Sequence, residues 1–311
     1  MIDGVRTVAD VLLRCERHAA AHHGMIARAE ALALGMTKHS IDRRLVTGAW
    51  IRVHPGVYRV AAFPETWRGR LLAALLWAGP EAFVSHRSAA FLYGLDGFRG
   101  GPIEITAPRA GSARGVKVYR STRPARTRVV DGIRVSWVDR TLLDVCAVAA
   151  PARCGLAMDD ALRKKLVTLD RLWAELRSCE RGVRGLKVFR ILLTGRDDRD
   201  GKLDSRLEAK ILAILRRIKD EVFEVQHPVV LDRKKYRLDF FHRRTTLGME
   251  GHSFTWHFGD DPHDSDADRH NDLVLAGIRM LYFTWDEVSF RPDEVEAKIR
   301  RAIAQPSLFR D

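Results

Sequence analysis

The sequence has little cysteine and no long apolar segment, and both shortages narrow the class of protein. Four cysteines occur in 311 residues and form no Cys-x-x-Cys pair, which argues against a zinc ribbon and against a disulfide framework. The longest apolar run, 71–79, is far shorter than the roughly 20 residues that span a membrane. The first residues also lack the basic and apolar segments of a secretion signal. We therefore expect a cytoplasmic protein with no membrane partner.

Acidic residues are fewer than basic ones, and most of this difference lies in the N-terminal half of the chain. There are 53 Lys and Arg against 40 Asp and Glu, a net charge of +13. Residues 1–150 hold 22 basic and 12 acidic residues (+10), which leaves 31 and 28 (+3) for residues 151–311. Such an excess is typical of a chain that binds a polyanion, so double-stranded DNA is the expected partner. The length and a hydrophobic content of 46% indicate several globular domains.

Residues 1–62 have the pattern of a winged helix-turn-helix. A short amphipathic helix is expected from Met25 to Leu34, and Thr37 is placed to cap a second helix. The segment 50–60 then predicts a small hairpin that turns at Pro55 and Gly56. Two helices followed by such a wing are a common DNA-binding motif.

The second helix of this motif is the element expected to contact bases. Its buried face is predicted at Ile41 and Leu45, and basic side chains leave the other side, as a recognition helix in a major groove requires. The wing adds side chains that can contact phosphates. The predicted DNA-binding residues are Thr37, Lys38, His39, Arg43, Arg44, Arg52 and His54.

Residues 63–195 predict a mixed α/β middle domain with a helical extension. The expected elements are helices at 65–77 and 86–93, strands at 103–107, 116–121 and 133–137, a helix capped by Asp139, and further helices between 158 and 193. The loops between 109 and 128 are basic, which suits contact with phosphate or with an acidic protein. For His86 and Arg87 a local hydrogen-bonding role is favoured over catalysis.

Three segments of these domains resemble AbiEi-type antitoxins, the transcriptional autoregulators of two-gene toxin-antitoxin systems in phage defence. They are Trp50-Ile51-Arg52-Val53-His54-Pro55-Gly56-Val57-Tyr58, Ser85-His86-Arg87-Ser88-Ala89-Ala90 and Val138-Asp139-Arg140-Thr141-Leu142-Leu143-Asp144. The similarity covers about 24–150. The resemblance implies repression of a promoter and, in some members, neutralisation of a nucleotidyltransferase-like toxin.

The charged, glycine-bounded run 195–201 predicts a linker, and residues 203–311 predict a third domain in the order helix, three strands, helix, strand. Two of the strands form a hairpin from Tyr236 to Gly251. A turn at residues 243 and 244 would place Asp239 opposite Gly248 and make Glu250 its diagonal neighbour. Two converging carboxylates, Asp239 and Glu250, are the pattern of a hard-cation site, with Mg²⁺ as the expected metal.

This third domain resembles an uncharacterised family related to the very-short-patch repair endonuclease, which has a restriction-endonuclease-like fold. The motifs that carry the resemblance, between 205 and 288, are Leu207-Glu208, Gln226-His227-Pro228-Val229, Arg237-Leu238-Asp239-Phe240, Glu250-Gly251, Asp268-Arg269-His270-Asn271-Asp272 and Met280-Leu281-Tyr282-Phe283-Thr284-Trp285. Family members usually carry a further acidic residue at the position of Gly248. Its loss removes one ordinary metal ligand.

The sequence therefore predicts a mixed α/β multidomain protein: a winged helix-turn-helix, an α/β middle domain and a restriction-endonuclease-like α/β domain. The favoured function is DNA binding of the AbiEi regulator type. One alternative is an active Mg²⁺-dependent DNA endonuclease in which Asp239 and Glu250 hold the metal, Glu208 assists, and His257 or His252 is the general acid or base. The other is an antitoxin that neutralises a cognate toxin and uses the nuclease fold as a scaffold.

Overall fold

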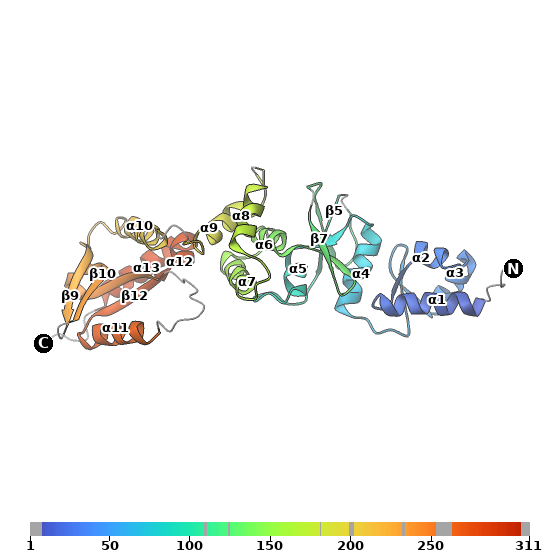
Figure 1. The fold of residues 1–311 in the computed structure, drawn as a ribbon, viewed down its shortest axis with the longest axis horizontal. Coiled ribbons are helices and arrows are strands. Elements are labelled where there is room, and N and C mark those ends of the chain that lie inside the picture. The colour runs from blue at the N-terminus through green and yellow to red at the C-terminus, as the bar shows by residue number, and fades with distance from the viewer. Residues whose placement is uncertain are drawn as a thin grey trace. The chain divides into compact units, whose positions relative to one another are not determined.

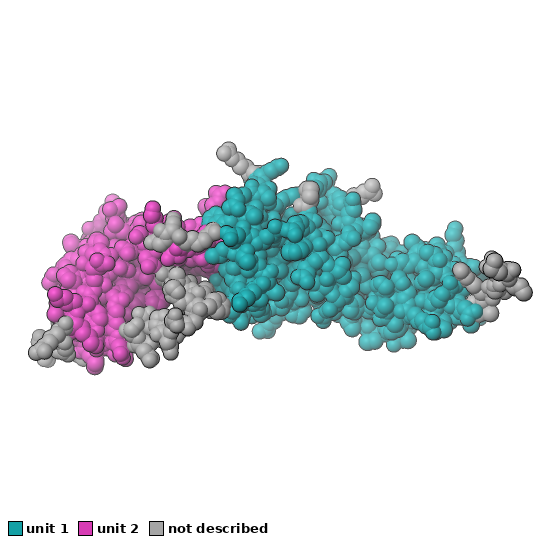
Figure 2. All heavy atoms as spheres, in the orientation of Figure 1, with its two compact units in different colours: residues 1–186 teal, residues 187–311 magenta. Residues whose placement is uncertain are grey.

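The computed structural model of the chain describes residues 8–108, 111–123, 125–180, 182–198, 202–231, 234–252 and 263–305. The chain forms two compact units, residues 1–186 and 187–311 (Figure 2). Both units mix helices with β-sheet, as the sequence predicted (Figure 1). Within the described ranges, no helix combines the length and the apolar character needed to cross a bilayer.

The first unit begins with the segment predicted to be a winged helix-turn-helix. Its elements are α1 (Val8–Ala21), β1 (Met25–Ala27), α2 (Arg28–Ala33), α3 (Lys38–Val46), β2 (Trp50–His54) and β3 (Val57–Val60). The helix predicted from Met25 to Leu34 was wrong in its first turn, because those residues form β1. Met25 pairs with Arg59, which makes a three-stranded sheet in the order β1-β3-β2. The cap was predicted correctly: the Thr37 side chain accepts a hydrogen bond from the Ser40 amide at 3.1 Å.

A five-stranded sheet forms the middle of the first unit, in the order β6-β5-β4-β8-β7. The elements here are α4 (Trp67–Ala78), β4 (Phe83–Val84), α5 (His86–Leu92), β5 (Ile103–Ala107), β6 (Val116–Arg120), β7 (Thr127–Val130), β8 (Ile133–Ser136), α6 (Val138–Cys146), α7 (Pro151–Arg163) and α8 (Leu169–Arg177). The short strands β4 and β7 were not predicted. The cap of α6 was predicted wrongly, since Trp137 is its N-cap residue and the Asp139 carboxylate lies inside the first turn.

The winged helix and the middle domain share a hydrophobic contact. Met25 and Val57 of the small sheet pack with Leu72 and Ala73 of α4 in one buried cluster. Because α4 belongs to the predicted middle domain, the predicted division at 62 is bridged by packed apolar side chains. We expect the two parts to move together.

The second unit contains α9 (Leu186–Thr194), of which residue 186 belongs to the first unit, followed by α10 (Leu203–Leu215), β9 (Glu224–Leu231), β10 (Lys234–His242), η1 (Arg243–Thr245), β11 (Leu247–His252), α11 (His263–Leu275), β12 (Arg279–Thr284), α12 (Trp285–Phe290) and α13 (Pro292–Ala304). Its sheet has the order β12-β11-β10-β9, with β12 parallel to β11 and the other pairs antiparallel. From α10 to β12, the order helix, three strands, helix, strand is the one that the sequence predicted. Helices α10, α12 and α13 share one core with the sheet.

The break between the units falls at 186, earlier than the predicted linker at 195–201. Gly195 lies against the Trp285 ring, and the Trp285 indole donates to the carbonyl of Ile191 at 2.9 Å. Arg196 forms an ion pair with Asp286 at 3.3 Å. Helix α9 is thus held by α12, and the described part of the predicted linker is packed inside the second unit.

Candidate functional site

The basic face of α3 is the first candidate site. Ile41 is fully buried beneath the helix, while Lys38, His39 and Arg43 are exposed. At about 100° per residue, Arg43 points away from Ile41, whereas Arg44 lies on the flank of the buried stripe. Arg44 is half-buried, and both arginines line a groove of about 560 Å³ between α1 and α3. Thr37 and Arg52 are also exposed.

His54 is the predicted DNA-binding residue that the structure places elsewhere. Only 8% of it is exposed, and its ring lies 5.7 Å from the Trp77 ring of α4. Burial lowers the pKa of His54, so the ring stays neutral at neutral pH. A neutral, buried imidazole is unsuited to contacting a DNA phosphate, and we assign His54 to the packing of the winged helix on the middle domain.

A pocket of about 680 Å³ in the second unit brings together the predicted acidic residues. Glu208 of α10, Asp239 of β10 and Glu250 of β11 all line it. Gln226 of β9 lies between two of them: its amide donates to Glu208 Oε2 at 2.9 Å and to Asp239 Oδ1 at 3.5 Å. Burial, and next the charge of Asp239, raise the pKa of Glu208. The Gly251 amide donates to Asp239 Oδ2 at 3.1 Å.

The register of the hairpin differs from the prediction. The connection is the 3₁₀ turn η1 followed by Thr246 with φ of 46°, instead of a two-residue turn. Phe241 therefore pairs with Gly248, and Phe240 pairs with Met249. Asp239 and Glu250 line one pocket, and Gly248 is not among its lining residues. A Cβ on Gly248 would be 2.5 Å from Met280 Sδ, in an apolar part of the sheet.

The carboxylates of this pocket are engaged by protein donors. Glu250 forms an ion pair with Arg269 of α11, and Glu208 and Asp239 share the Gln226 amide. In the part of the chain that the structure describes, no group of three or more His, Cys, Asp or Glu is placed to hold a metal ion. Mg²⁺ prefers carboxylate oxygens, and to use Glu250 it would have to displace the Arg269 guanidinium group. His257, the predicted acid or base, lies outside the described residues.

Arg269 and Gln226 are the site residues that sequence reasoning missed. Both belong to segments that carried the family resemblance, Gln226-His227-Pro228-Val229 and Asp268-Arg269-His270-Asn271-Asp272. The spacing along α11 gave no indication that Arg269 would reach Glu250, since the contact joins elements that are distant in sequence. His252, the other predicted acid or base, does line the pocket, together with His270 and Tyr282.

Comparisons with known proteins agree with part of this description. Residues 15–61 match the family model described as "Transcriptional regulator, AbiEi antitoxin". The solved catalytic domain of the homing endonuclease I-Bth0305I is similar at 22% identity, with a TM-score of 0.25, over 30% of this chain and 90% of that one. The RV2827C protein from Mycobacterium tuberculosis is similar at 16% identity, with a TM-score of 0.41, over 61% of this chain and 76% of that one. No curated protein sequence matches. Residues 15–61 of this chain are thus similar to the AbiEi antitoxin regulators.

Proposed function

We propose that this protein binds duplex DNA through α3 and regulates transcription from a promoter, its own among them. The observation that carries the proposal is the exposed basic face of α3, formed by Lys38, His39 and Arg43 on a helix that buried Ile41 holds in place. An arginine at such a position can bind a guanine edge in the major groove. The family match of residues 15–61 covers this same helix.

The test is fluorescence anisotropy with a duplex taken from upstream of the gene. Arg43→Ala should lose about 1–3 kcal/mol of binding free energy if it contacts a base. Arg44→Ala should lose less, because that side chain lies on the flank of the helix. Arg17→Ala is the matched control, since Arg17 is an exposed arginine on α1. Equal binding by the Arg43→Ala variant and wild type would reject α3 as the recognition helix.

DNA cleavage with Mg²⁺ is the second candidate, because Glu208, Asp239 and Glu250 line one pocket. The ion pair of Glu250 with Arg269 makes it the less favoured of the two. Nicking of plasmid DNA in Mg²⁺ or Mn²⁺ by wild type, with loss of nicking in Asp239→Asn, would establish it. Equal products from both proteins would reject it. Neutralisation of a cognate toxin stays a prediction of the AbiEi resemblance.

A further inference from the structure

The first unit contains a pocket that neither candidate activity uses. It has a volume of about 800 Å³ and lies where the segment between β6 and β7 meets α6 and α8. This volume is within the range of small-molecule sites, roughly 300–1,000 Å³. Its walls combine four arginines and three carboxylates with small apolar side chains such as Ala125 and Ala174. The arginines are Arg123, Arg126, Arg140 and Arg171, and the carboxylates are Asp139, Glu175 and Glu180.

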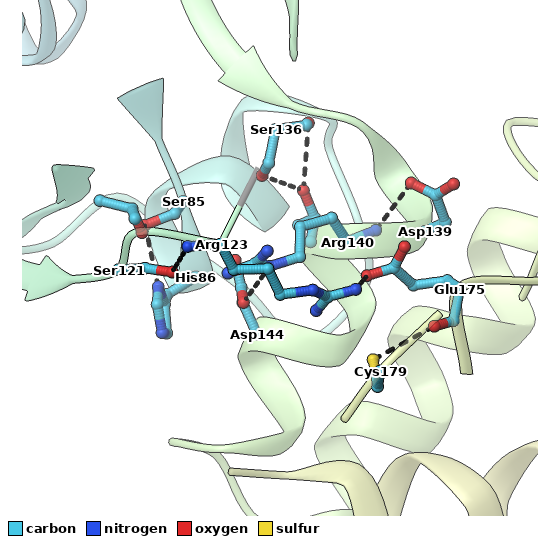
Figure 3. Close-up of polar contacts among 12 residues, drawn as sticks. Ser85, His86, Ser121, Arg123, Ser136, Asp139, Arg140, Asp144, Glu175 and Cys179 are labelled. Carbon is cyan, nitrogen blue, oxygen red and sulfur yellow. Dashed lines mark hydrogen bonds and ion pairs between the residues drawn. The ribbon is translucent and has the colours of Figure 1, made fainter. Parts of the chain in front are cut away.

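Three of these arginines are fixed by carboxylates from α6 and α8. The pairs are Arg123–Glu175 at 2.8 Å, Arg140–Asp144 at 2.7 Å and Arg171–Asp139 at 2.5 Å. Figure 3 shows Arg123 and Arg140 converging between Asp144 and Glu175. The fourth, Arg126, lies over the Trp137 ring, 4.3 Å from its centroid. The guanidinium groups are therefore positioned before any ligand binds, which lowers the entropic cost of binding.

Two of the positioned guanidinium groups have unused donors. The Arg140 side chain is nine-tenths buried, and its Nη1 has no hydrogen-bond partner among the described residues. Nη1 of Arg123 also has no hydrogen-bond partner among the described residues, although the Arg123 side chain is one-quarter exposed. Leaving a buried donor unpaired costs about 1–3 kcal/mol. Asp144 Oδ2, in the same ion pair as Arg140, is also without a partner among the described residues. Buried polar groups in native proteins almost always have partners, so the two donors are available to an acceptor that the described residues do not supply.

We propose that this pocket binds a small phosphorylated molecule of nucleotide size. Its phosphate group lies between Arg123 and Arg140, after a small rotation of the more exposed Arg123, and its organic part lies along Ala125 and Ala174. A phosphate offers several acceptor oxygens to planar guanidinium groups, which bind it in a bidentate manner. A free phosphate ion would leave most of the 800 Å³ unfilled, so the volume favours an organic phosphate.

The experiment is calorimetry and thermal melting of the full chain with ADP, inorganic phosphate and adenosine as probes. ADP should raise the Tm, inorganic phosphate should do so less, and adenosine should have no effect. Arg123→Gln should weaken ADP binding at least about tenfold, or about 1.4 kcal/mol. Arg128→Gln is the matched control, because Arg128 is exposed on β7 and does not line the pocket. It should bind ADP as wild type does.

A second variant separates the loss of binding from a loss of folding. Ala174→Trp fills the pocket and leaves all four arginines in place, so it should also weaken ADP binding while DNA binding by α3 persists. No rise in Tm with millimolar ADP or phosphate would overturn the proposal. So would equal effects of adenosine and ADP, ADP binding that Arg123→Gln leaves unchanged, or a stabilising effect that only duplex DNA produces.

Discussion

Arg269 on α11 forms an ion pair with the buried Glu250 on β11. Arg269 also donates to the backbone carbonyl of Arg237 at 3.0 Å, which ties α11 to β10. The Glu250 side chain is 9% exposed, so its charge needs a partner inside the protein. In this chain, that partner is an arginine from the next helix.

Removing Arg269 should therefore destabilise the second unit. Arg269→Met removes the ion pair of the buried Glu250, and because Arg269 is itself one-third exposed, water will offset part of the loss. We expect a loss of about 1–3 kcal/mol in the free energy of unfolding, measured by urea denaturation. The double variant Arg269→Met with Glu250→Gln should recover part of this loss. Equal stability of Arg269→Met and wild type would show that the pair contributes nothing.

The substitution Gly248→Glu gives a prediction opposite to the one the sequence suggested. With Gly248 opposite Asp239, an added carboxylate would complete a metal site. In the observed register, a Cβ at this position meets Met280 Sδ at 2.5 Å and Leu238 Cδ1 at 3.1 Å. Gly248→Glu should lower the Tm and produce no gain in plasmid nicking, because it buries a charge against apolar side chains.

Gly248→Ala is the control for that substitution. It introduces the same Cβ without the charge, and the Met280 side chain is flexible enough to shift, so the loss should be smaller, about 1 kcal/mol. A Gly248→Glu protein that melts at the wild-type temperature and nicks DNA faster would instead support the predicted register, in which Gly248 lies opposite Asp239.

The order of elements could be predicted because it depends on local patterns. The alternation along β10 and the apolar stripe of α10 are visible in the sequence, and Thr37 was identified as a cap from its position alone. Two carboxylates were expected to share one site, and Asp239 and Glu250 do line one pocket. Period and capping are properties of neighbouring residues, so no tertiary information was required.

What could not be predicted depends on contacts between distant segments. The length of the turn after His242 set the register, and a longer connection than expected moved Gly248 away from Asp239. The residues Met25–Ala27 form a strand because β3 offers them a pairing edge, although their own pattern suits a helix. His54 is buried only because α4 lies against the wing. Sequence spacing carries none of these long-range pairings.

Truncation can test whether α9 belongs to the second unit. A fragment that begins at Val183 keeps α9 and should fold as a soluble protein. A fragment that begins at Lys202 loses the hydrogen bond of Trp285 to Ile191 and the ion pair of Arg196 with Asp286. We expect it to unfold at lower urea concentration, since the Trp285 indole is left without that acceptor. Equal urea midpoints for the two fragments would indicate that the domain boundary lies in the predicted linker at 195–201.

His86 predicts how the stability of the first unit depends on pH. Its ring is buried, stacks on Tyr119 with centroids 3.4 Å apart, and lies 2.8 Å from Ser85 Oγ through Nδ1. Burial, followed by the charges of Arg140, Lys117 and Arg87, lowers the pKa of His86 from 6.5 to about 3. His86 therefore stays neutral in the folded protein at pH values where the unfolded chain already binds a proton.

The sign of the effect follows from that difference. As the pH falls through 6.5, the unfolded state gains a proton that the folded state does not, so stability present above pH 6.5 is lost progressively towards pH 3. Between pH 7 and pH 5, this residue should remove about 2 kcal/mol from the free energy of unfolding.

His86→Asn does not titrate, and asparagine tolerates the φ of 51° found here. Urea unfolding at both pH values should show a shallower pH dependence for His86→Asn than for wild type. A His86→Asn protein that keeps the wild-type dependence would mean that burial does not lower the pKa of His86 in the folded state.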